Sequence, residues 1–172
     1  MNVLIAFGSH LGSTAEIAAR IAEVLRGFGS KVSVQPAASA GPVVAYDAVI
    51  VGGGTYAGRW HPDAAAFIRT NAVELAARPT WLFSSGPLGT AGAVAPRDPV
   101  DLKSLASLVG ARGHTIFAGS HDRATVAGSD LSRLERFVAA RFVPEGDWRD
   151  WPAIEAWART IADELRPTVH AA

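Results

Sequence analysis

A short loop near the N-terminus combines hydroxyl side chains with glycine and directly follows an apolar segment. A helix-patterned segment comes next, so backbone N–H groups and the positive end of a helix dipole would converge on this loop. Hydroxyl groups can add side-chain donors, and His10 is a candidate cation within the loop. Amides plus hydroxyls suit a single terminal phosphate. The residues expected to bind it are Ser9, His10, Leu11, Gly12, Ser13 and Thr14.

The spacing within this loop excludes two common phosphate sites. It lacks the Lys of G-x-x-x-x-G-K-[ST], which a triphosphate site needs, and the spacing of G-x-G-x-x-G, which a standard dinucleotide site needs. The alternative is an ordinary strand-to-helix turn with a Ser or Thr cap. His10 is either a donor to a phosphate oxygen, whose charge would make binding weaken as the pH rises, or a solvent-facing loop residue.

Two further loops are rich in glycine. In the first, residues 52–61, three glycines allow close backbone approach, Tyr56 and Trp60 offer flat faces, and Arg59 offers a cation. The second, residues 84–89, supplies hydroxyls and backbone N–H groups. A planar, polar-edged aromatic ligand would fit between such walls, whereas the alternative is a pair of surface turns. The residues expected to contact this ligand are Gly54, Thr55, Tyr56, Ala57, Gly58, Trp60, Ser84, Ser85, Gly86, Pro87, Leu88 and Gly89.

The elements that must position these loops follow from the hydrophobic pattern. Short apolar runs alternate with helix-period segments, which is typical of an α/β fold with a parallel sheet. The pattern predicts a doubly wound, three-layer sandwich with a five-stranded parallel sheet in the order 2-1-3-4-5. In that order the loops after the first, third and fourth strands meet beyond the carboxyl ends of the strands, at the topological switch point. Strands are expected at 3–7, 31–34, 48–51, 81–83 and 115–118, and helices at 17–28, 64–76, 102–109, 131–138 and 154–165.

Composition limits the function classes. The 172 residues fit one domain, 1–172, and the 16 basic and 16 acidic side chains balance, so we expect no nucleic-acid partner. Cysteine is absent, which excludes disulfides and thiol catalysis, and the histidines are too scattered to predict a metal site. The chain enters a strand at once and has no apolar run that could span a bilayer, so we expect a cytoplasmic protein. The tryptophans near the C-terminus are expected to pack in the core, leaving at most peripheral membrane contact.

Residues 5–14, followed by Ala18 and Ile21, resemble the N-terminal signature of the flavodoxins. The departures are Ala6, where a larger apolar residue is usual, and Leu11, where many members have a second Thr. The resemblance implies a flavodoxin-like fold and the cofactor FMN. The phosphate of FMN would lie in the N-terminal loop, and the isoalloxazine ring would lie between the two glycine-rich loops.

The C-terminal half, together with the loop at residues 56–61, resembles one branch of this family, the menaquinone-dependent protoporphyrinogen oxidases and their uncharacterised relatives. The matching segments are residues 56–61, 117–119, 130–137, 146–151 and 154–158. The chain departs from this branch in residues 90–100, where Arg97 is the single cation and the oxidases carry a longer basic segment.

The residues show no Ser-His-Asp set and no paired carboxylates, so the flavin would carry the chemistry. We expect an FMN-dependent oxidoreductase that passes electrons between a small molecule and an acceptor such as a quinone, with protoporphyrinogen-oxidase-like activity implied by the resemblance. Three alternatives stay open. They are a flavodoxin-type electron carrier for protein partners, a deazaflavin-binding variant, and a flavin-free interaction domain.

Overall fold

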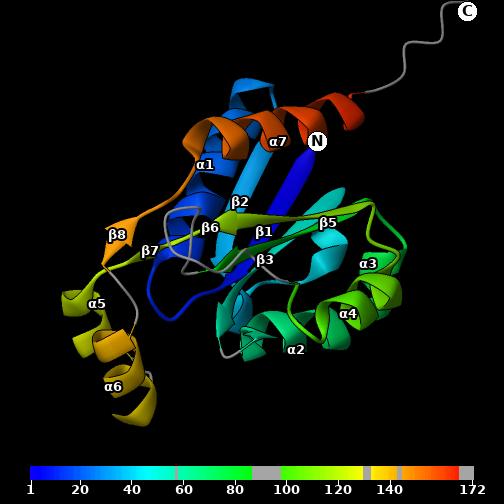
Figure 1. The fold of residues 1–172 in the computed structure, drawn as a ribbon. Coiled ribbons are helices and arrows are strands. Elements are labelled where there is room, and N and C mark those ends of the chain that lie inside the picture. The colour runs from blue at the N-terminus through cyan, green and yellow to red at the C-terminus, as the bar shows by residue number, and fades with distance from the viewer. Residues whose placement is uncertain (57, 87–97, 130–132, 143–144, 167–172) are drawn as a thin grey trace, which may run out of the picture.

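The computed structural model describes residues 1–56, 58–86, 98–129, 133–142 and 145–166. In this part of the chain the main sheet has the order β2-β1-β3-β5-β6, with all four neighbouring pairs parallel (Figure 1). A short strand, β4, adds to the end of β3 in antiparallel orientation. Without that hairpin the parallel strands follow the predicted order 2-1-3-4-5, so the predicted fold class is confirmed. The strands are β1 (Asn2–Gly8), β2 (Lys31–Pro36), β3 (Ala48–Tyr56), β4 (Arg59–Trp60), β5 (Thr80–Gly86) and β6 (Gly113–Ala118).

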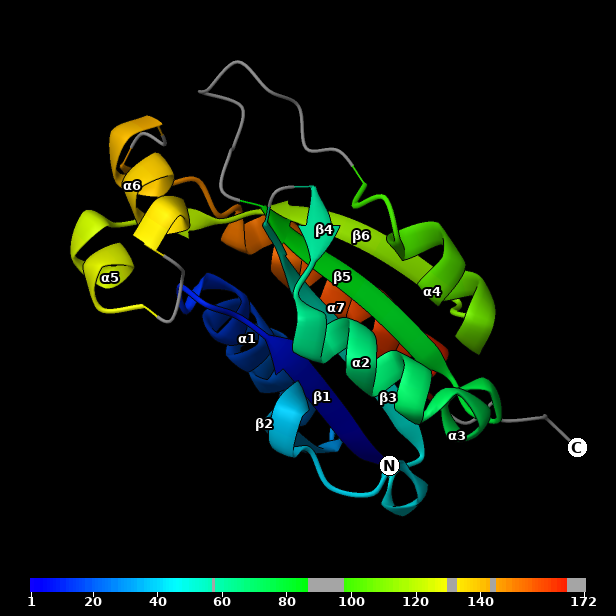
Figure 2. The ribbon, with the colours of Figure 1, turned by 90° about the horizontal axis from the view of Figure 1, so that it is seen from below.

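Helices cover both faces of this sheet, which gives three layers (Figures 1 and 2). On one face lie α1 (Ser13–Gly27) and α7 (Trp151–Glu164), and on the other α2 (Pro62–Thr70), α3 (Ala72–Ala76) and α4 (Leu102–Val109). Two short 3-10 helices, η1 (Ala37–Ser39) and η2 (Val43–Ala45), connect β2 to β3.

Strand alternation divides the core into two clusters. Ile5 on β1 faces α1 and α7, where it joins Ile17 and Ile154. The preceding residue, Leu4, faces the other layer and joins Ile68 of α2. Successive side chains of a strand point to opposite faces, so a strand buried on both faces needs a continuous apolar run, as β1 has.

A short antiparallel strand pair that encloses two helices follows β6. The strands β7 (Ser120–His121) and β8 (Gly146–Asp147) pair antiparallel, and between them the chain forms α5 (Arg123–Ala127) and α6 (Arg133–Phe142). These two helices extend beyond the carboxyl ends of the sheet strands (Figure 2). The sequence predicted a helix near α6, with Leu131 lying outside the described residues, but not α5 or the hairpin. Both hairpin strands have only two residues, too few for an alternating pattern.

The glycines after the third strand belong to the strand itself. The sequence placed its end at residue 51, but Gly52, Gly53 and Gly54 continue it and pair with residues 83–85 of β5. Rings from other elements explain this composition. Phe83 lies against Gly52 so closely that no Cβ would fit, and a Cβ on Gly53 would lie 2.7 Å from the Trp60 ring.

The helix predicted at 64–76 is split into α2 and α3 at Asn71. The backbone of Asn71 leaves the helical region, with φ −108° and ψ 25°. Its side-chain amide donates to the carbonyl of Phe67 at 2.9 Å, which satisfies one C-terminal acceptor of α2.

Candidate functional site

The N-terminus of α1 has the properties of an anion site. Gly12, immediately before the helix, has φ +82°, a left-handed conformation that glycine adopts without strain. Among the described residues no side chain caps α1, so its first-turn N–H groups keep no side-chain acceptor. Thr14 in that turn is only 1% exposed. An anion at this position would meet several amides and the positive end of a 15-residue helix.

Two hydroxyls shape the loop before α1. The Ser9 hydroxyl oxygen accepts from the amide of Gly12 at 3.0 Å, and that of Ser13 accepts from the amide of Ser120 at 3.1 Å. A hydroxyl that accepts still has its own proton to donate. Both side chains can therefore hold the loop and donate to a bound anion at the same time.

The loops after β1 and β3 are in contact, as the predicted topology requires. The amide of His10 donates to the Tyr56 hydroxyl at 3.0 Å, and the centroids of these two rings are 4.7 Å apart. The His10 ring also lies 4.1 Å from that of His61, a buried residue whose Nδ1 accepts from the amide of Asp63. A Cβ on Gly8 would lie 2.6 Å from the His61 ring, so glycine is needed beneath this histidine.

The ends of β5 and β6 complete this edge of the sheet. Ser85, which is buried, is in register with Gly54, and Gly86 ends β5. A Cβ on Gly119 would lie 2.5 Å from the carbonyl oxygen of Gly86 and 3.2 Å from Oγ of Ser13. Gly119 therefore lets β6 meet β5 and the start of α1. The predicted contact residues Ala57, Pro87, Leu88 and Gly89 lie outside the described residues.

Trp60 and Ser84 take positions that differ from their predicted roles. We expected a flat indole face and a hydroxyl directed at a ligand, but the two side chains are 3% and 0% exposed. The Trp60 indole Nε1 donates to the Ser84 hydroxyl oxygen at 2.7 Å. Ser84 shares its strand face with Leu82, which packs in the cluster under α2 and α4, so its side chain points into that layer. Tyr56, by contrast, lies where the loops after β1 and β3 meet, in contact with His10.

A hydrogen-bond chain that the sequence reasoning missed continues from Ser84. The His114 Nε2 lies 3.0 Å from the Ser84 hydroxyl oxygen, and the His114 Nδ1 lies 3.6 Å from Oδ1 of Asp98. Burial lowers the pKa of His114, while the Asp98 carboxylate acts in the opposite direction. The residues are far apart in sequence and meet only because β5 and β6 are neighbours, so no local signal could have revealed them.

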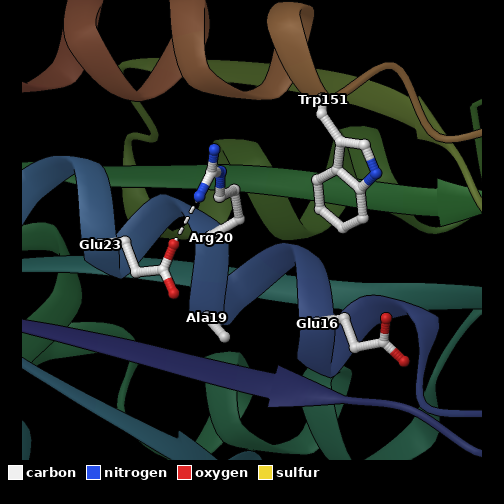
Figure 3. A pocket seen from close by; sticks show the side chains of 5 residues that line it. All are labelled: Glu16, Ala19, Arg20, Glu23 and Trp151. Carbon is white, nitrogen blue, oxygen red and sulfur yellow. Dashed lines mark hydrogen bonds and ion pairs between the residues drawn. The ribbon is translucent and has the colours of Figure 1, made fainter.

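A separate hollow of about 460 Å³ lies where the outer face of α1 meets the start of α7 (Figure 3). Its charges are already paired. Arg20 contacts Glu23 at 2.7 Å and Glu155 at 2.5 Å, and Arg149 contacts Glu16 at 2.5 Å. Trp151 closes one side. This hollow is lined by helix side chains and does not involve the converging loops. The candidate site is therefore the loop edge, the edge of the sheet at the carboxyl ends of β1, β3 and β5.

Within the described residues no group of three His, Asp or Glu side chains could hold a metal ion. In the same part of the chain, every helix is too short or too polar to cross a bilayer.

The order of the strands and the helix N-terminus at the switch point define a doubly wound α/β protein with a candidate anion site beyond the carboxyl ends of its strands. The profile of the flavodoxin domain family matches residues 4–130, and the chain belongs to this family. No curated protein matches the sequence closely enough to count as a relative.

Solved structures share the fold at low sequence identity. The flavodoxin of Streptococcus pneumoniae TIGR4 superposes with a TM-score of 0.62 at 18% identity, over 96% of this chain and 100% of that one. A point mutant of the flavodoxin from Pseudomonas aeruginosa gives 0.61 at 18% identity, over 97% and 100% of the two chains. Rubredoxin oxygen:oxidoreductase from Desulfovibrio gigas gives 0.64 at 18% identity, over 99% of this chain but 37% of that one. At this identity the comparison establishes the fold.

Proposed function

We propose that this protein binds FMN and works as an oxidoreductase that passes electrons between a small molecule and an acceptor such as a quinone. The observation that carries the proposal is the N-terminus of α1. Its amides have no side-chain cap among the described residues, and it lies beside Tyr56 at the switch point of the sheet. Membership of the flavodoxin domain family supports a flavin as the ligand.

The residues present fit a flavin mononucleotide. The first-turn amides of α1, with the hydroxyls of Ser9, Ser13 and Thr14, would hold the phosphate. Tyr56 and the backbone at Gly54 and Gly86 would lie along the ring. When bound, the flavin supplies one- and two-electron transfer. The chain would contribute binding, orientation and local electrostatics. Its donors to the phosphate would be amides and hydroxyls rather than Lys or Arg side chains.

A flavodoxin-type electron carrier is the second candidate, favoured by the two flavodoxins that superpose over their full length. An oxidoreductase role is supported by the similarity of this chain to about a third of a larger oxygen:oxidoreductase. Activity with a small-molecule donor and a quinone, without any protein partner, would distinguish an enzyme from a carrier. The resemblance to protoporphyrinogen oxidases makes protoporphyrinogen with menaquinone the first substrate pair to test. A deazaflavin in the same site would restrict the protein to hydride transfer.

The first test is a visible absorption spectrum of the purified protein before and after addition of FMN. We expect flavin bands that stay with the protein through gel filtration. Riboflavin is the matched control ligand, because it has the same ring but no phosphate, and it should bind more weakly than FMN. Failure to retain FMN would overturn the proposal. Equal affinities for the two flavins would show that the α1 N-terminus does not bind the phosphate.

A further inference from the structure

A buried chain of polar groups links the surface to the hairpin formed by β3 and β4. It begins at Asp98, whose side chain is 70% exposed, and passes through His114 to Ser84 and Trp60. Its inner members lie under α2 and α4, on the opposite side of the sheet from α1 and α7. Ser84 is completely buried, and Trp60 is in the core cluster of that layer.

The order Asp98, His114, Ser84 is that of a hydrolase triad, but the serine oxygen is in the wrong environment for attack. It is 0% exposed and already receives the indole N–H of Trp60 at 2.7 Å. A nucleophile must reach its substrate, so this oxygen serves another purpose. Its two contacts place it between His114 and Trp60.

Trp60 controls the part of the chain that lies next to the proposed flavin ring. Its backbone is in register with Thr55, and its amide donates to Oδ1 of Asp101 at 3.3 Å. Its ring packs directly on Gly53, where a Cβ would lie 2.7 Å away. The position of the indole therefore determines the path of β3 just before Tyr56.

The protonation state of His114 decides whether the buried Ser84 hydroxyl proton has an acceptor. A neutral imidazole with its proton on Nδ1 accepts the Ser84 hydroxyl proton at Nε2, and Ser84 in turn accepts from Trp60. A protonated imidazole has no acceptor, so Ser84 would face two donors and its own buried proton would lose its partner. Asp98 is the carboxylate within ion-pair distance of His114. Other charged groups on the packed elements are Asp101 and Lys103 at the start of α4 and Arg112, whose guanidinium lies over Trp81.

We propose that His114 is a positioning residue for the ring-binding hairpin and that its neutral form holds Trp60 in place through Ser84. The consequence for flavin binding rests on the proposed function, whereas the hydrogen-bond chain itself does not. Lowering the pH should loosen the hairpin and weaken binding of the flavin ring.

The hydrogen-bond chain from His114 to Trp60 is tested first without any flavin, by NMR of the tryptophan indole N–H groups. The protein has five tryptophans, and the Trp60 signal is identified by its loss in Trp60→Phe, which keeps the ring packing. We expect this signal to shift in one step as the pH falls. His114→Gln, whose amide oxygen still accepts but does not titrate, should abolish the step. His121→Gln is the matched control, because His121 is also buried but its ring nitrogens make no hydrogen bond to a described residue, and it should keep the step. A Trp60 signal without a step in the wild type, or a step that persists in His114→Gln, would overturn the proposal.

The second measurement is the affinity for riboflavin at several pH values. Riboflavin is used because it has no phosphate, so titration of the phosphate does not contribute. We expect a several-fold loss of affinity over the pH range of the indole step in the wild type, and a constant affinity in His114→Gln. A riboflavin affinity that stays constant over the pH range of the indole step in the wild type would refute the link to the hairpin. If neither FMN nor riboflavin binds at any pH, the proposed function fails, and the indole titration still decides the role of His114.

Discussion

Gly119 offers a sharp test of how the loop edge is assembled. A methyl group at this position would lie 2.5 Å from the backbone carbonyl oxygen of Gly86, roughly 0.9 Å short of an ordinary contact. The obstacle is backbone, so no side-chain rotation can relieve it. Overpacking of this kind costs about 1–3 kcal/mol. We therefore expect Gly119→Ala to lower the free energy of unfolding by about that amount.

The same substitution should also disturb the candidate anion site. The added methyl would lie 3.2 Å from Oγ of Ser13, which accepts from the amide of Ser120. A shift of β6 away from Gly86 would pull on the first turn of α1. FMN should then bind more weakly to Gly119→Ala than to the wild type.

Urea unfolding of the flavin-free protein measures the first effect. The matched control is Gly27→Ala in the last turn of α1, where the added methyl meets no described atom within 4 Å beyond its chain neighbours and the backbone of its own helix, and the glycine φ is not positive. Alanine is the better helix former, so this variant should gain up to about 1 kcal/mol. Equal stability of Gly119→Ala and the wild type would refute the close approach of β5 and β6.

Three further predictions concern single residues. Thr14→Val should weaken FMN binding by roughly 1–3 kcal/mol, because a charged acceptor loses a donor, and an unchanged affinity in a fluorescence titration would remove Thr14 from the site. Asp150→Ala should destabilise the protein by about 0.5–2 kcal/mol, because Oδ1 of Asp150 caps α7 by accepting from the amide of Ala153 at 3.0 Å. Asp163→Ala near the other end of α7 is the control and should change the urea midpoint little, so equal losses would argue against the cap. Burial lowers the pKa of His114 below its usual 6.5, so the unfolded chain takes up this proton more readily than the folded chain. The His114 contribution to the free energy of unfolding is therefore fully present above about pH 6.5 and decreases as the pH falls below it, and urea midpoints at several pH values should show this component in the wild type but not in His114→Gln.

The sequence predicted the layers and the strand order well, because both depend on local periodicity. The run at residues 3–7 is apolar on both faces and could only be a buried strand, and the helix predicted at 102–109 has the same limits as α4. The contact between the loops after β1 and β3 followed from the topology, since parallel strands have their carboxyl ends at one edge of the sheet.

What the sequence did not predict depends on contacts between distant elements. A tryptophan in a glycine-rich loop looks like a ligand wall, whereas Trp60 is buried and its indole donates to Ser84 on another strand. The length of β3 depends on pairing with β5, which outweighs the low strand preference of its glycines. His114 and Asp98 have no shared motif, so their proximity could not be read from either segment alone.

The glycines of β3 have an evolutionary consequence. Gly52 and Gly53 face opposite sides of the sheet. The ring of Phe83 occupies the space that a side chain at Gly52 would need, and the ring of Trp60 occupies that space at Gly53. A larger residue at either position can be accommodated only if its partner ring becomes smaller in the same lineage. The two pairs lie on different faces, so each can change without the other. Residues 52 and 83 should therefore covary as one unit, and residues 53 and 60 as a second, independent unit.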